Sequence, residues 1–134
     1  MGNLRSLEQL DDATRVLGSL IDHLPAMVAY WDKEQHNVVA NAAYAQWFGL
    51  RPDEMTGRHI REILGEDVYG LNRPHIDAVL AGEEQTVRRT LVDTDGRVRH
   101  TDAHYAPDVL DVTVEGFFVL VTDITAQVEM ERMA

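Results

Sequence analysis

Histidine and acidic side chains alternate near the end of the chain, in a pattern that could bind a metal ion. His100, Asp102 and His104 would share one face of a strand, and imidazole and carboxylate groups are common zinc ligands. In a strand, His100 and His104 lie roughly 13 Å apart, which is too far for both to bind one ion. We therefore expect a polar sheet face there and no metal site.

Two other histidines, His59 and His75, could supply an axial ligand to a haem iron. Both fall in segments expected to be helical, where a histidine more often caps a helix or lies at the surface. The chain has no cysteine, which excludes disulfides, thiolate metal sites and cysteine nucleophiles. The residues therefore disfavour haem and leave the cofactor unknown.

No set of side chains in the sequence matches a catalytic arrangement. Serine occurs only at Ser6 and Ser19, in the first helical stretch and not on a nucleophile elbow. No glycine-rich loop could hold a phosphate. Acid pairs such as Asp11 and Asp12 are consecutive, which is typical of a solvated surface. We therefore expect no catalytic residues and no enzyme activity.

Arg89 lies between two apolar residues that would share its side of a strand. If Val87 and Leu91 point inward, Arg89 points inward with them. A buried guanidinium needs an anion, which could be an internal Asp or Glu or the carboxylate of a ligand; the sequence leaves both open. A matching pleat in the next strand would place the histidine face outside and three other residues inside: Thr101, Ala103 and Tyr105.

The composition indicates one globular domain. The chain has 134 residues, of which 45% are hydrophobic and 26% are charged. The net charge of -11 repels phosphate backbones, so we expect no nucleic-acid partner. No apolar run approaches the ~18 to 20 residues that a membrane span needs, and no secretory signal opens the chain. We expect a cytoplasmic protein with no membrane span.

The chain begins with an apolar stripe at helical spacing, from about Ser6 to Leu24. Pro25 disfavours helix in the residue before it, so this helix should end near His23. The stripe must be buried against this domain or against a second copy, and we expect a homodimer through it. Its members recur mostly at steps of three and four residues: Leu7, Leu10, Leu17, Leu20, Ile21 and Leu24.

The rest of the chain alternates between strands and short helices. Residues 27–31 and 38–40 read as a hairpin, and Asn41 could cap a helix over 42–48. Helical spacing also marks the segment from Tyr69 to Leu80, which should begin in earnest at Pro74. Three strands follow, over 85–92, 97–106 and 116–122. This order predicts an α+β fold with one antiparallel sheet and short helices over one face.

At this point the sequence resembles the PAS sensor domains, from about Leu24 to Thr125. The order and spacing of several short motifs carry the resemblance: Tyr30-Trp31-Asp32, Asn41-Ala42-Ala43-Tyr44, Trp47-Phe48-Gly49, Met55-Thr56-Gly57-Arg58, Ala81-Gly82-Glu83, Asp95-Gly96-Arg97, Gly116 and Asp123-Ile124-Thr125. The resemblance implies a five-stranded antiparallel sheet in the order 2-1-5-4-3 and a ligand-sized interior. It also implies a flanking helix over 1–24, a PAS domain over 25–125 and the start of an output helix over 126–134.

Light-sensing PAS relatives that form a flavin adduct or carry a coumaroyl chromophore depend on a cysteine. This chain has none, and Ile60 stands where the adduct-forming residue would be. The resemblance therefore implies a sensor of another kind, joined to an effector such as a kinase or cyclase.

We interpret the chain as a sensory module that binds a small organic ligand in its interior and signals through its flanking helices. The alternative is a ligand-free dimerisation or scaffolding module with a filled core. An interior cavity of about 300 Å³ or more would favour the sensor. The residues expected to line the ligand site are Tyr30, Tyr44, Phe48, Ile60, Leu64, Ile76, Arg89, Thr101, Tyr105, Phe117 and Val119.

Overall fold

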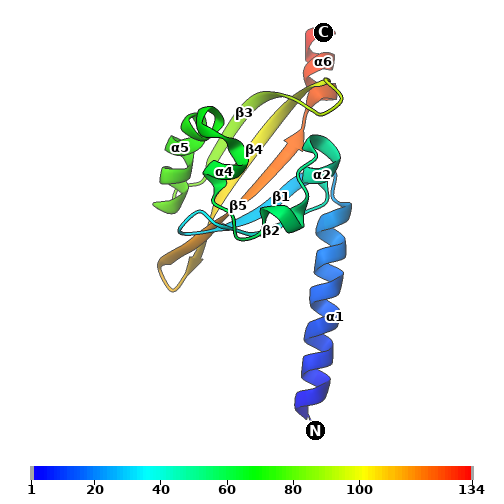
Figure 1. Cartoon of the computed structure of the whole chain (residues 1–134), viewed down its shortest axis with the longest axis vertical. Coiled ribbons are helices and arrows are strands. Elements are labelled where there is room, and N and C mark those ends of the chain that lie inside the picture. The colour runs from blue at the N-terminus through cyan, green and yellow to red at the C-terminus, as the bar shows by residue number, and fades with distance from the viewer. Residues whose placement is uncertain (1, 134) are drawn as a thin grey trace.

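The structure is a computed structural model that describes residues 2–133 of the chain and the side chains of residues 8–133. Its sheet has five antiparallel strands in the order β2-β1-β5-β4-β3, as expected. Figure 1 shows the helices α2 to α5 gathered over one face of this sheet. The strands are β1 (Ala26–Asp32), β2 (Asn37–Ala40), β3 (Gln85–Val92), β4 (Val98–Leu110) and β5 (Thr113–Asp123). The α+β fold and the strand order predicted from the sequence are therefore confirmed.

The pleat of the strands sorts side chains between a helix-covered face and an open face. Along β5, Phe117 is 0% exposed whereas its neighbour Phe118 is 46% exposed. Val119 pairs with Ala29 of β1 and with Tyr105 of β4, so these three residues share the covered face. The hydrophobic core lies between this face and the helices.

Four helices form the covering layer: α2 (Ala43–Phe48), α3 (Pro52–Met55), α4 (Ile60–Leu64) and α5 (Glu66–Leu80). The expectation that the last of these begins at Pro74 is wrong, because α5 runs through that proline from Glu66. Contacts outside the helix hold its first half: the Tyr69 hydroxyl donates to Gln35 at 2.7 Å, and Asn72 is buried. Tertiary contacts therefore outweigh the local preference of proline to begin a helix.

Two helices flank the sheet domain. The first, α1 (Gly2–His23), ends where Pro25 predicts, and α6 (Thr125–Met133) follows β5. Figure 1 shows that they lie on the same side of the domain and project toward opposite ends of the molecule, α1 downward and α6 upward in this view. Leu10 and Leu17 of α1 are 62% and 60% exposed, so the domain itself does not bury the apolar stripe; the side chain of Leu7 lies outside the described residues. Within residues 2–133, no helix combines the length and apolar character needed to cross a bilayer.

Candidate functional site

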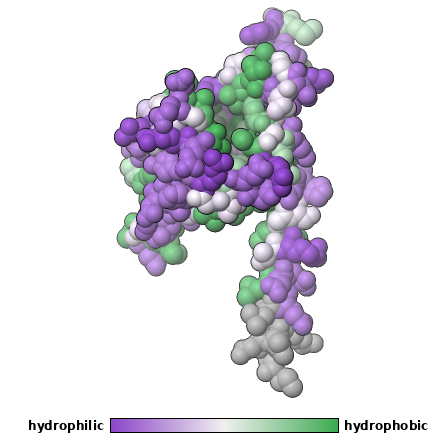
Figure 2. Space-filling model, viewed as in Figure 1, coloured by the Kyte–Doolittle hydropathy of each residue, from purple (hydrophilic) through white to green (hydrophobic). Residues whose placement is uncertain are grey.

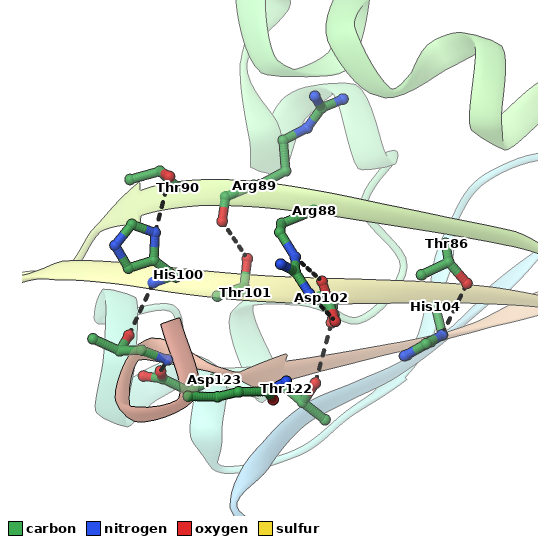
Figure 3. Close-up of polar contacts among 12 residues, drawn as sticks. Thr86, Arg88, Arg89, Thr90, His100, Thr101, Asp102, His104, Thr122 and Asp123 are labelled. Atoms are coloured by element: carbon green, nitrogen blue, oxygen red, sulfur yellow. Dashed lines mark hydrogen bonds and ion pairs between the residues drawn. The ribbon is translucent and has the colours of Figure 1, made fainter. Parts of the chain in front are cut away.

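Arg89 extends from β3 toward α5, on the covered side of the sheet. Its Nη2 atom donates to the backbone oxygen of Leu71 at 3.2 Å and to Oδ1 of Asn72 at 3.4 Å. Figure 3 shows its side chain pointing away from Arg88, which pairs with Asp102 on the other face. Among the described side chains, no carboxylate lies within ion-pair distance of Arg89. The sequence left open whether Arg89 pairs with an internal Asp or Glu or with a ligand, and the structure shows no internal acid partner.

A small set of buried polar groups adjoins Arg89. Asn72 Oδ1 also accepts from the Tyr105 hydroxyl, at 3.4 Å. Burial raises the pKa of Tyr105, and the nearby Arg89 charge partly offsets this. Burial also raises the pKa of Tyr44, with a smaller contribution from Tyr105. Both phenols are therefore neutral at physiological pH and able to donate hydrogen bonds.

Most of the expected lining residues lie in the core between the sheet and the helices. Phe48 and Leu64 are partly buried and pack against that core. The fully buried members of the set come from β4, β5, α2, α4 and α5: Tyr44, Ile60, Ile76, Thr101, Tyr105, Phe117 and Val119. Together with Arg89, these nine residues place ten of the eleven candidates on the covered side of the sheet.

Tyr30 is the exception, because it lies on the open face of the sheet. It pairs with Phe118 across the strands, with ring centroids 4.9 Å apart, and its hydroxyl donates to Asp108 at 2.6 Å. Burial, reinforced by this hydrogen bond to Asp108, raises the pKa of Tyr30 to about 12. The expectation that Tyr30 lines the interior is therefore wrong. Trp31 occupies the inward position on β1 instead.

The surface is hollowed over the strands (Figure 2) and along α1. Figure 2 shows a hollow with apolar surface between α5 and α2, over the strands. A groove of about 290 Å³ lies elsewhere, along α1, where it is lined by Arg15, Val16, Ser19, Leu20 and His23. This groove lies outside the interior, so its volume does not distinguish a sensor from a filled core.

One buried acceptor, Asn37 Oδ1, has no partner among the described residues.

The histidines serve local structure. His59 Nδ1 accepts from the backbone N–H of Arg61 at the start of α4, and His75 Nδ1 lies 3.0 Å from Gln85 Oε1. On the open face, His100 faces Thr90 and His104 faces Thr86, as Figure 3 shows. No three His, Asp or Glu side chains converge on one point in the described part of the chain.

Arg99 joins three segments where β5 passes into α6. Its Nε atom lies 2.9 Å from Asp93 in the β3–β4 turn, and its Nη1 atom lies 2.7 Å from Asp123. Its guanidinium carbon also lies 4.7 Å from the centre of the Trp47 ring in α2. The β4 strand therefore connects the helix layer directly to the start of the exit helix.

The acids of this junction stay ionised. Hydrogen bonds lower the pKa of Asp93, first from the backbone N–H of Arg97 and then from Arg99, against an opposing effect of burial. Burial would raise the pKa of Asp123, but hydrogen bonds from Thr125 and Arg99 outweigh it and lower that pKa. Thr125 in turn accepts from the backbone N–H of His100 at 2.9 Å. The junction therefore carries a full ionic network at neutral pH.

The other flanking helix is tied to the domain by Asn41 and Asp22. Asn41 is completely buried; its Oδ1 accepts from Val28 N at 2.9 Å, and its Nδ2 donates to the oxygens of Ala26 and Ile21. It therefore does not cap α2 as predicted. Asp22 of α1 accepts from the N–H of Ala42, the residue that precedes α2, at 2.9 Å.

Sequence reasoning missed most of these connections. Asp123 and Thr125 were marked only as part of a motif, and neither Arg99 nor Asp22 was singled out. Their partners are distant in the sequence: 24 residues separate Arg99 from Asp123, and 20 separate Asp22 from Ala42. No local pattern could have paired them.

The chain is an α+β domain: a single antiparallel sheet in this order, covered on one face by short helices and flanked by two projecting helices. A family model described as the PAS fold matches residues 21–129. The chain therefore belongs to the PAS fold family. No curated protein matches its sequence.

Solved structures share the fold. The PAS domain of BvgS from Bordetella pertussis is 26% identical with a TM-score of 0.69, and the match covers 94% of this chain and 96% of that one. The PAS domain of an HTR-like protein from Haloarcula marismortui is 18% identical with a TM-score of 0.64, covering 90% and 98%. A ligand- and DNA-bound VqmA of Vibrio cholerae is 22% identical with a TM-score of 0.68, covering 89% of this chain and 51% of VqmA.

Proposed function

We propose that this PAS domain is a non-catalytic sensory module that acts as a homodimer through α1. In this proposal, a small organic ligand binds on the covered side of the sheet. The resulting shift passes through the flanking helices to an effector domain, such as a kinase or cyclase. The observation that carries the proposal is that the short helix α2 is bonded at one end to α1 and at the other to the α6 junction.

The contacts of α2 explain how the two flanking helices could move together. At its start, Asp22 of α1 accepts the Ala42 N–H. At its end, Trp47 lies under Arg99, and its backbone oxygen accepts from Thr94 N at 3.1 Å. A ligand that binds one packing of the helix layer more tightly than another would shift α2 and, through these contacts, both flanking helices.

The exposed stripe of α1 supports the homodimer. Leu10 and Leu17 are spaced by seven residues within α1, the repeat of a coiled-coil seam, and Leu24 follows seven residues later, just beyond the end of the helix. All three side chains are exposed in the single chain. Pairing two copies along this seam would remove apolar surface from water and place the two sheet domains side by side.

Two further observations support a small-molecule signal. VqmA has been solved bound to DPO, so a relative with this fold holds a small ligand. The net charge of -11 disfavours nucleic acid as a partner of this domain. The alternative is a ligand-free scaffold, and the aromatic residues that occupy the interior favour it. Native mass spectrometry of protein purified from cells separates the two, because only the sensor should carry an additional small mass.

The proposed coupling between the flanking helices is tested by removing a contact of α1 and measuring the stability of α6. Asp22→Ala removes the acceptor for the Ala42 N–H, and amide hydrogen exchange is followed at Val128, whose N–H donates to Ile124 at 2.9 Å. We expect faster exchange at Val128 in this variant than in wild type. The control Asp12→Ala removes an exposed acid of the same helix and should leave exchange unchanged. Equal exchange in wild type and Asp22→Ala would show that the two helices are not coupled through α2.

A further inference from the structure

Arg89 differs from the other arginines of the chain in how its charge is matched. Six arginines form ion pairs with acids, all at exposed or partly exposed sites: Arg51, Arg58, Arg61, Arg73, Arg88 and Arg99. Arg15, Arg97 and Arg132 are exposed to solvent and have no such pair among the side chains of residues 8–133. Among the described side chains, Arg89 is the one arginine that is partly buried and has no acid partner. This is notable in a chain with 23 acidic residues.

The bonds that Arg89 does form leave much of its capacity unused. Both go to neutral oxygens, at 3.2 and 3.4 Å, and both use the same nitrogen, Nη2. A guanidinium has five N–H donors, and its planar edge matches the two oxygens of a carboxylate. The Nε and Nη1 atoms have no acceptor among residues 8–133. The site thus retains a donor edge suited to an anion.

The neighbours of Arg89 would complete a carboxylate site. The Tyr105 hydroxyl shares the acceptor Asn72 with Arg89, so it lies close to the guanidinium. A carboxylate that displaced Asn72 Oδ1 would accept the proton that the Tyr105 hydroxyl now donates to that oxygen at 3.4 Å. His75 lies parallel to the Tyr105 ring, with centroids 6.4 Å apart, and extends the aromatic wall. Ile76 and Val87 add apolar surface nearby.

We infer that Arg89, with Asn72 and Tyr105, forms the anchor for a small organic monocarboxylate that enters between β3 and α5. This deepens the proposed function and rests on it, since it names the chemical class of the ligand. The carboxylate would replace Leu71 and Asn72 as the acceptor of Arg89. Binding would therefore alter the link between α5 and the sheet, which is where a sensor of this design must register its ligand.

The charge of the site favours a carboxylate over a phosphate. Among the described residues that contact this cluster, Arg89 is the one Arg or Lys, and no glycine-rich loop is present. A phosphate group carries close to two negative charges at neutral pH and usually takes several cationic or backbone donors. One guanidinium and one or two hydroxyls match a single negative charge.

The experiment uses the full chain and defined probes: phenylacetate, benzoate and hexanoate, with phenylacetamide as the neutral match and inorganic phosphate as the other anion. Binding is measured by calorimetry and by the shift of the Arg89 Nε–Hε signal in NMR spectra, assigned by its loss in Arg89→Lys. Arg89→Met is the test variant. Arg97→Met is its control, because Arg97 is exposed and has no acid partner.

We expect at least one carboxylate to bind wild type and Arg97→Met equally, and to bind Arg89→Met about 10- to 100-fold more weakly. Phenylacetamide and phosphate should not bind. Without ligand, Arg89→Met should fold with slightly lower stability than wild type, because it loses two long hydrogen bonds to neutral oxygens but leaves no buried acid without its partner. Should this variant not fold, the Arg89 signal in wild type still decides the question, because a bound carboxylate must move it.

Three outcomes would overturn the inference: equal binding to Arg89→Met, preferential binding of phosphate, or no movement of the Arg89 signal with any carboxylate at about 10 mM. None of these outcomes bears on the coupling of α1 to α6, because the Asp22→Ala exchange experiment needs no ligand. A failed carboxylate site is thus distinguishable from a failed signalling module.

Discussion

The guanidinium carbon of Arg99 lies 4.7 Å from the centre of the Trp47 ring, so a cation of the sheet rests on the last turn of α2. The same side chain holds Asp123 at 2.7 Å, at the end of β5. Any movement of α2 that displaces Trp47 therefore acts on the residue that precedes the exit helix. Arg99 therefore connects the helix layer to the start of α6 through a single side chain.

Replacing Arg99 should loosen the exit helix more than the domain. Arg99→Gln removes both ion pairs and the contact with Trp47, and we expect it to lower the free energy of unfolding by about 1 to 2 kcal/mol, since the site is partly exposed. Amide exchange at Val128 should accelerate more than exchange in β1. Arg97→Gln is the control and should change stability by less than about 0.5 kcal/mol. Unchanged exchange in α6 would show that Arg99 does not hold the junction.

The junction should weaken in acid. Because the folded-state pKa of Asp123 is lowered, its carboxylate stabilises the fold above the unfolded pKa, and this stabilisation is lost as pH falls through the folded value. Urea unfolding of wild type and Asp123→Asn should therefore differ most near pH 7. The difference should shrink below about pH 4 and disappear in stronger acid. A difference that stays constant from pH 7 to pH 3 would contradict the assignment.

Gly116 and Gly70 should respond oppositely to alanine. A Cβ atom at Gly116 would collide with the backbone oxygen of Trp31 and lie 2.6 Å from the Tyr30 hydroxyl, so Gly116→Ala should cost about 2 to 3 kcal/mol. At Gly70, within α5, an added Cβ meets no atom within 4 Å. Gly70→Ala should therefore stabilise the helix by about 1 kcal/mol. Urea unfolding measures both, and equal effects would show that the packing around Gly116 is not as described.

The apolar stripe of α1 should control assembly. We expect the wild-type chain to sediment as a dimer, because Leu10, Leu17 and Leu20 leave an apolar stripe of α1 in water. Leu17→Asp should give a monomer, and removal of residues 1–20 should give a monomer or an aggregate. Asp12→Ala, on the same helix, should remain dimeric. A dimer that survives the removal of residues 1–20 would place the interface elsewhere.

The strands show where sequence reasoning succeeds. Arg89 and Thr101 pair across β3 and β4 and both face the helices, as the alternation of Val87, Arg89 and Leu91 predicts. The inference works because polar and apolar residues alternate clearly in that strand. Tyr30 shows the converse: Ala26 to Trp31 are all apolar or aromatic, so the alternation has no visible sign. Only Phe118 and Asp108, distant in the sequence, decide which way Tyr30 points.

The junctions show a second limit. Asn41 has the side chain of a helix cap and stands where a cap is expected, yet it bonds to Val28, Ala26 and Ile21. A buried side-chain amide forms hydrogen bonds with the donors and acceptors around it, and for Asn41 these belong to segments that fold beside it. Local preference could name the residue as important but could not name its partners.

The most direct test of the account is a double-mutant cycle between Trp47 and Asp123, which both contact Arg99. Amide exchange at Val128 gives the free energy of opening α6 in wild type, Trp47→Leu, Asp123→Asn and the double variant. We predict that the two effects differ from additivity by more than about 0.5 kcal/mol, and that they become additive when Arg99→Gln is also present. Additive effects with Arg99 intact would contradict the claim that the helix layer communicates with the exit helix through this residue.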